Sequence, residues 1–169
     1  MTLANGRRYL AIPGPSVVPD RVLAAMHQAA PNIYEGALPD MVATLWPDLR
    51  QLAGTTGAVA TYIANGHAAW EAANANLFSR GDKALVLATG VFGHGWAHSA
   101  RAVGIDVEVL DFNRAPADMN QIEQALRADK AHKIKAVLTT QVDTASTVKT
   151  DIPALRAAMD AAGHPALLA

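Results

Sequence analysis

The sequence predicts an α/β protein built on a doubly wound, mostly parallel sheet. Short apolar runs alternate with helical segments along most of the chain, which is typical of repeated strand–helix units. Each run is continuous rather than alternating, as expected for strands that helices cover on both faces. Five runs are predicted to be strands: residues 59–63, 84–88, 107–110, 136–140 and 166–169.

The composition argues against several other classes of protein. The chain has 169 residues, of which 51% are hydrophobic, and a formal net charge of −1, so one domain with a sizeable core is expected. Its basic clusters are short, which argues against a nucleic-acid or membrane surface. Cysteine is absent, which excludes disulfides and thiol chemistry. The sequence shows neither a signal peptide nor a membrane-spanning segment, so we expect a soluble cytoplasmic protein.

Residues 1–57 differ from the rest and are predicted to form an N-terminal arm with helices, ahead of a sheet domain over residues 58–169. Residues 12–19 contain three prolines, which favour a stiff, extended arm that could pack across a partner subunit. Residues 20–29 and 38–53 are predicted to be helical, and Pro47 should kink or divide the second helix.

Two later helices have clear sequence signals. Residues 120–128 place Ile122 and Leu126 on one face. Asp151 is predicted to cap a helix over residues 152–162 that ends at Gly163. Because residues 166–169 then resemble the opening of a further buried strand, we expect the chain to be the front part of a longer protein.

Three segments are predicted to be loops at the carboxyl ends of strands, where doubly wound sheets bind ligands. In the first, Asn65, Gly66 and His67 join the strand at 59–63 to a run of good helix formers. Free backbone N–H groups at the positive end of that helix would suit a phosphate. The alternative is an ordinary turn in which Asn65 caps the helix.

The second predicted loop covers residues 90–96 and is rich in glycine, which lets a backbone approach a ligand closely. Phe92 could lie flat against a planar ring, or it could simply pack on the sheet. The glycine spacing is not that of the dinucleotide fingerprint. His94 and His98 share a helix face, but without an adjacent glutamate or a third ligand we predict no metal site.

The third predicted loop covers residues 141–147 and places Asp143 and several hydroxyl groups at the same edge of the sheet. The alternative is a solvated polar loop, because Asp and Thr are common in turns. Each of the three signals is weak alone, and their arrangement on one sheet is the stronger argument.

These residues resemble a known family. Residues 13–16 and 18–19 (Pro-Gly-Pro-Ser and Val-Pro) are similar to the N-terminal signature of the class V aminotransferases, which are fold-type I pyridoxal-phosphate enzymes. The similarity is strongest to the alanine–glyoxylate, serine–glyoxylate and serine–pyruvate group, and it continues through residues 65–73, 79–82 and 90–93. It implies the three-layer α/β/α sandwich of the large domain of these enzymes, and a homodimer.

The resemblance also implies roles for individual residues. Asn65, Gly66 and His67 would cradle the cofactor phosphate, and Phe92 would stack on the pyridine ring. Thr144 stands where a Ser or Thr donates a hydrogen bond toward the 3-oxygen of the cofactor. Two departures are a Phe where the family more often has Trp or Tyr, and a third loop that begins with Asp rather than Glu.

The implied activity is transamination between a small amino acid (serine or alanine) and a 2-oxo acid (glyoxylate or pyruvate). Gly14 and Tyr34 would lie on the substrate side, although Tyr34 could equally be a half-buried loop aromatic. No catalytic residue is expected within this chain, because the Schiff-base lysine and the aspartate that pairs with the pyridinium nitrogen would follow Ala169. None of the five lysines present has the expected context, so the fragment alone is predicted to be inactive.

Two other classes stay open. A nucleotide-binding α/β domain without pyridoxal phosphate would share the strand–helix alternation. It should also show a glycine-rich turn after its first strand and an acidic residue at the end of its second, and neither is present. A non-catalytic assembly module is the other class, and the absence of a suitable lysine favours it.

Overall fold

The computed structural model describes residues 12, 14 and 16–169, and the chain divides into two compact units, Met1–Thr61 and Tyr62–Ala169. The division lies close to the boundary that the sequence suggests after residue 57. Pro13 and Pro15 of the predicted stiff arm lie outside the described residues. The identity of the units as an arm and a cofactor domain stays a prediction.

The first unit contains two helices, α1 (Asp20–Met26) and α2 (Ala37–Ala53), and neither has a buried residue. α1 is shorter than predicted and ends where the amide of His27 bonds the carbonyls of Leu23 and Ala24. Of the two expected effects of Pro47, a division of α2 does not occur, and a kink stays a prediction. The proline removes one N–H donor, but a helix of 17 residues keeps enough other hydrogen bonds to continue through it.

The strand predicted over residues 59–63 is also absent, and this prediction is wrong. The segment has no hydrogen-bonding partner among the described strands, and Tyr62 and Ile63 are exposed. Apolar and β-branched residues favour a strand only where a neighbouring strand can pair with their backbone groups.

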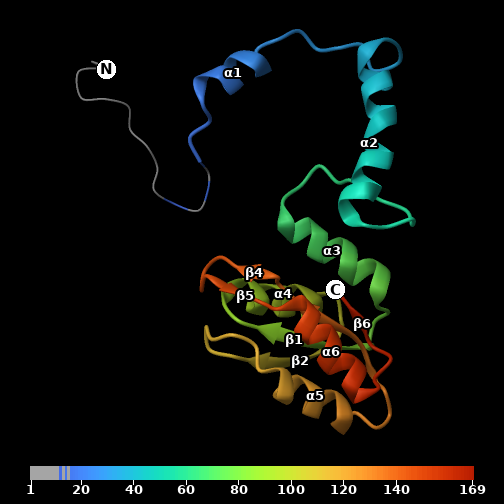
Figure 1. Ribbon diagram of the computed structural model, residues 1–169, viewed down its shortest axis with the longest axis vertical. Coiled ribbons are helices and arrows are strands. Elements are labelled where there is room, and N and C mark those ends of the chain that lie inside the picture. The colour runs from blue at the N-terminus through green and yellow to red at the C-terminus, as the bar shows by residue number, and fades with distance from the viewer. Residues whose placement is uncertain (1–11, 13, 15) are drawn as a thin grey trace, which may run out of the picture. The chain divides into compact units, whose positions relative to one another are not determined.

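The second unit is organised around a parallel sheet (Figure 1). The strands are β1 (Lys83–Ala88), β2 (Asp106–Asp111), β3 (Ile134–Thr139) and β6 (Leu167–Leu168), in the order β2-β1-β3-β6. All three pairings are parallel, which confirms four of the five predicted strands. A short antiparallel hairpin of β4 (Val142–Asp143) and β5 (Val148–Lys149) was not predicted.

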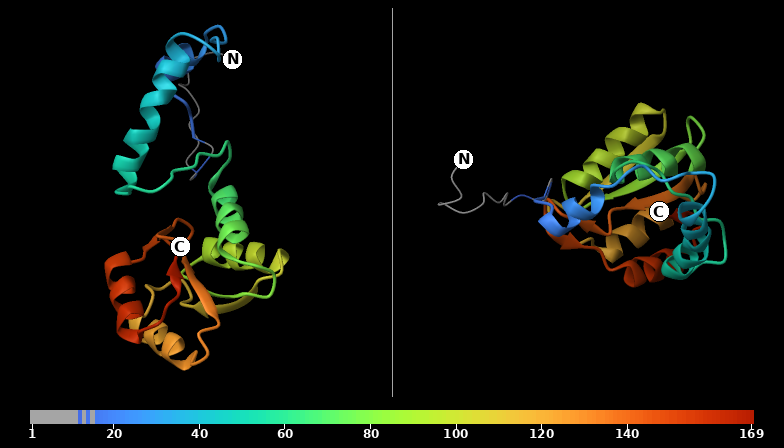
Figure 2. Two further views of the ribbon diagram at one scale, coloured as in Figure 1. Left: turned by 90° about the vertical axis from the view of Figure 1, so that its right-hand side faces the viewer. Right: turned by 90° about the horizontal axis from the view of Figure 1, so that it is seen from above.

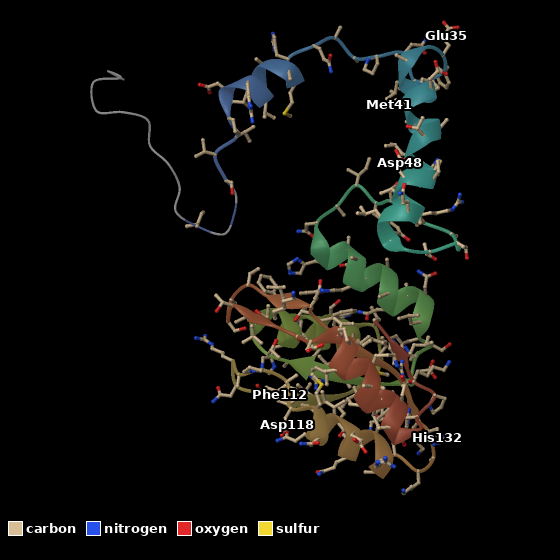
Figure 3. The ribbon with its side chains drawn as sticks, in the orientation of Figure 1. Glu35, Met41, Asp48, Phe112, Asp118 and His132 are labelled. Atoms are coloured by element: carbon tan, nitrogen blue, oxygen red, sulfur yellow. The ribbon has the colours of Figure 1, made fainter. Side chains whose placement is uncertain are left out.

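Helices cover both faces of this sheet (Figure 2). α5 (Met119–Ala128) and α6 (Ile152–Ala162) pack on one face, over a core that includes Leu85, Leu87 and Phe112 (labelled in Figure 3). α3 (Gly66–Leu77) and α4 (Val91–Ala102) cover the other face. The predicted α/β/α sandwich is confirmed. Among the described residues, no helix combines the length and apolar character needed to cross a membrane.

Candidate cofactor site

The strand order creates a topological switch point between β1 and β3. The chain leaves β1 into α4 on one face of the sheet, whereas α5, which leads into β3, and α6, which follows it, lie on the opposite face. The connections therefore diverge at the carboxyl ends of these two neighbouring strands. Ligands of open α/β sheets bind in the crevice at such a point.

The second predicted loop, residues 90–96, is in fact the start of a helix, because α4 begins at Val91. Packing requires two of its three glycines. A Cβ on Gly90 would lie 2.5 Å from the Asp143 carboxylate, and a Cβ on Gly93 would lie 2.7 Å from the Cα of Ala88. The expected glycine-rich loop is replaced by a close contact between a helix, a strand and a hairpin.

The third predicted loop is exposed at most of its positions, as the alternative of a solvated polar loop expects, but the side chain of Asp143 is fully buried. Its Oδ2 accepts hydrogen bonds from the backbone N–H of Phe92 (2.9 Å) and Gly93 (3.1 Å), and its Oδ1 accepts one from Ala145 (3.1 Å). The carboxylate thereby caps the N-terminus of α4 from the β4–β5 hairpin. Sequence reasoning missed this contact, although Gly90 and Asp143 both follow neighbouring strands.

The first predicted loop follows no strand, but it has the geometry of a helix N-terminus. Asn65 caps α3, since its Oδ1 accepts a hydrogen bond from the His67 N–H at 3.1 Å. Asn65, Gly66 and His67 are exposed, and the first turn of α3 carries no acidic residue. A Cβ on Gly66 would meet no atom within 4 Å, so open space faces the positive end of this helix.

An aromatic cluster joins the beginnings of α3 and α4. The ring of Phe92 lies 6.3 Å from the rings of both His67 and Trp70, and Trp70 stacks on Trp96 at 5.8 Å. The Trp96 Nε1 donates to the side-chain oxygen of Asn74 at 3.0 Å, which anchors the cluster between the two helices. Phe92 is itself half-buried and belongs to neither core cluster.

The structure therefore brings together residues from all three predicted segments. Phe92 contacts His67 through its ring and Asp143 through its backbone. Thr144, which follows Asp143 directly, is exposed. His94 pairs with Asp111 at 3.2 Å, and no group of three metal-ligating side chains occurs in the part of the chain that the structure describes.

Two predicted substrate residues, Gly14 and Tyr34, lie in the first unit and are exposed. Tyr34 is 87% exposed, so the alternative of a half-buried loop aromatic is wrong: no apolar side chains enclose it. Their roles toward substrate stay predictions.

Comparison with known proteins shows which proteins the chain resembles. No family model matches the chain. It is 41% identical to the serine–glyoxylate aminotransferase of Methylorubrum extorquens over 99% of its own length and 42% of that protein. It is 36% identical to the L-aspartate–glyoxylate aminotransferase of Paracoccus denitrificans, over 93% of the chain and 40% of that protein.

A solved structure shows the same fold. The ureidoglycine–glyoxylate aminotransferase of Bacillus subtilis matches 92% of this chain with 40% of its own, at a TM-score of 0.77 and 23% identity. The chain thus spans about two fifths of the length of its curated relatives. Over that span, the chain is similar in sequence to glyoxylate aminotransferases and shares the fold of solved aminotransferases.

Proposed function

We propose that this chain forms part of the cofactor site of a pyridoxal-phosphate-dependent aminotransferase. Its substrates would be a small amino acid, serine or alanine, and a 2-oxo acid, glyoxylate or pyruvate. The observation that carries the proposal is the meeting of three separate segments, around Phe92, beside the switch point of the sheet. The names of the relatives, which include glyoxylate, support the acceptor.

The residues present fit the cofactor. Two helix N-termini come together here, and the one that starts α4 is already occupied by the carboxylate of Asp143. The N-terminus of α3 at Asn65, Gly66 and His67 is therefore the position for the phosphate, where backbone N–H groups and the helix dipole favour an anion.

Phe92 and Thr144 would hold the ring of the cofactor. The half-buried ring of Phe92 offers a face for stacking, and the exposed hydroxyl of Thr144 would donate toward the 3-oxygen. When bound, pyridoxal phosphate supplies an electron sink for the charge that develops at the substrate carbon. We also propose that Gly14 and Tyr34 bind the substrate.

None of the lysines of this chain suits the catalytic role. Lys83 pairs with Glu108 at 2.6 Å and Lys135 with Asp82 at 3.1 Å, both at the amino end of the sheet. Lys130 and Lys133 lie in the connection from α5 to β3, and Lys149 lies on the hairpin. We therefore expect the 169-residue chain alone to release no keto acid from serine or alanine in the presence of glyoxylate. Turnover by the purified chain would contradict this.

The proposal places the whole enzyme in the cytoplasm as a homodimer. Support for the dimer comes from the first unit, where α1 and α2 present apolar side chains without burying any of them. These side chains include Met41 (labelled in Figure 3), Leu45 and Leu52.

Titration of the full-length protein with pyridoxal phosphate tests the function. We expect a protein-bound absorption band between about 330 and 430 nm that changes when serine is added, followed by release of a keto acid. Glyoxylate should then restore the original band. A protein that develops no such band, or that binds a nucleotide instead, would belong to one of the other α/β functional classes.

A further inference from the structure

Asp143 carries a buried negative charge that no side-chain cation balances. It is fully buried, and none of the ion pairs within the described part of the chain involves it. Its charge is compensated instead by three backbone N–H groups, two of which belong to the first turn of α4. A carboxylate at a helix N-terminus is stabilised by these donors and by the helix dipole.

Gly90 makes this contact possible. Its φ of 178° is extended backbone that any residue can adopt, so the conformation alone does not require glycine. A Cβ at this position would nevertheless lie between 2.5 and 2.7 Å from the three carboxyl atoms of Asp143. Residue 90 therefore leaves room for the Asp143 carboxylate because it has no side chain.

The two residues next to this contact are those assigned to the cofactor ring. Phe92 donates its own backbone N–H to Asp143, so the carboxylate fixes the backbone from which the ring projects. Thr144 follows Asp143 in the chain, and the Ala145 N–H bonds the other carboxyl oxygen, which closes the turn that contains Thr144.

We propose that Asp143 is a positioning residue that holds Phe92 and Thr144 in register with each other across the crevice between β1 and β3. The proposal rests on the proposed function, because it concerns residues assigned there to pyridoxal phosphate. Asp143 itself does not have to touch the cofactor: it acts through the first turn of α4 and through the hairpin turn.

The test compares three variants of the full-length protein: Asp143→Asn, Gly90→Ala and the double variant. An asparagine keeps the size of the side chain, but its NH2 group cannot accept a hydrogen bond, so one set of backbone donors loses its partner. Gly90→Ala keeps the carboxylate and only displaces it, and it tests the same contact if Asp143→Asn does not fold. Asp151→Asn is the matched control, because Asp151 caps α6 in the same way through the Ala154 N–H at 3.0 Å.

Two measurements are made on each variant. In the cofactor-free protein, hydrogen exchange at the Phe92 and Gly93 amides should be at least about tenfold faster in Asp143→Asn and in Gly90→Ala than in the wild type. Titration of the visible band should show pyridoxal phosphate bound about tenfold more weakly in both. The double variant should bind the cofactor no more weakly than the single variant with the lower affinity, because both changes break the same contact.

Different results would separate the two proposals. Unchanged amide exchange, or an equal change at Phe92 and Gly93 in Asp151→Asn, would overturn the positioning role. Faster exchange with unchanged cofactor affinity would also overturn it, while leaving the proposed function intact. A wild-type protein that binds no pyridoxal phosphate would refute the proposed function, and with it the part of this proposal that concerns the cofactor.

Discussion

At the scale of single residues, Gly66 gives the sharpest test of the phosphate site. Because its Cβ position faces open space, the fold of the protein does not require glycine there. Gly66→Val should leave the melting temperature of the cofactor-free protein nearly unchanged. The valine side chain would block the approach of phosphate and weaken binding of pyridoxal phosphate by about 1.5–3 kcal/mol, the value of a hydrogen bond to a charged group.

Two controls accompany this measurement, which is a titration followed by absorbance. Gly66→Ala should have a smaller effect, since its side chain is shorter. Pyridoxal without phosphate should bind Gly66→Val and the wild type equally. If pyridoxal phosphate binds Gly66→Val as tightly as it binds the wild type, the N-terminus of α3 is only a structural turn.

Phe92 and Phe112 allow a proposed stacking residue to be compared with a core residue. Phe92 lies outside both core clusters, whereas Phe112 is 8% exposed and packs in the core. Phe92→Ala should weaken cofactor binding by about 0.5–1.5 kcal/mol and alter the visible band. The melting temperature of the cofactor-free protein should change little. Phe112→Ala should lower the free energy of unfolding by about 3–5 kcal/mol. Thermal melts that rank the two variants in the opposite order would exclude the stacking role.

At the scale of elements, α6 is the clearest case in which local sequence determines structure. Its N-cap Asp151 and its C-cap Gly163, which has a φ of 64°, are both as predicted. Asp151→Ala should lower the free energy of unfolding by about 1 kcal/mol, because the Ala154 N–H loses its acceptor.

Chemical denaturation at neutral pH measures this loss, with Asp160→Ala as the control. Asp160 forms an exposed pair with Arg156 on the same helix, and such pairs contribute only about 0.3–0.5 kcal/mol. Equal losses of unfolding free energy in the two variants would mean that the Asp151 cap contributes no more than an exposed ion pair.

The elements that the sequence did not predict depend on partners far along the chain. Residues 59–63 have the composition of a strand but no neighbour to pair with, and residues 90–96 have the glycines of a loop but form the start of a helix. In the sequence Asp143 resembles an ordinary turn residue, and only the folded structure shows it beside Gly90. Helix caps and buried strands are local signals, whereas these three features are decided by tertiary contacts.

At the scale of the whole molecule, a partly buried contact at the amino-terminal side of the sheet should make the stability depend on pH. The Oδ2 of Asp129 accepts hydrogen bonds from the Ile134 N–H (2.7 Å) and the His164 Nε2 (3.2 Å). The ring of His164 also lies 4.8 Å from that of His132 (labelled in Figure 3). Burial raises the pKa of Asp129, but hydrogen bonds from the Ile134 and Lys133 backbone and from His164 outweigh it and hold the pKa below its usual range.

A lowered pKa in the folded state means that the unfolded state binds the proton more tightly. The stability from Asp129 is therefore fully present above the unfolded pKa of about 3.9 and is lost as the pH falls through the lower, folded pKa. Denaturation between about pH 5 and 3 should show a steeper loss of unfolding free energy in the wild type than in Asp129→Asn. The exposed Asp160→Asn variant should behave like the wild type. Parallel pH profiles for the wild type and Asp129→Asn would contradict this role.

The contact between Asp143 and Phe92 has a consequence for the order of events during synthesis. Phe92 and Asp143 are 51 residues apart in sequence, so Phe92 is synthesised first and the residues up to Asp143 follow. At about 5–20 residues per second, the ribosome needs about 3–10 seconds to add the rest. Throughout that interval the Asp143 carboxylate is not available to the amides in the first turn of α4. The nascent chain can therefore fix the backbone of Phe92 in this contact only after the β4–β5 hairpin has been translated.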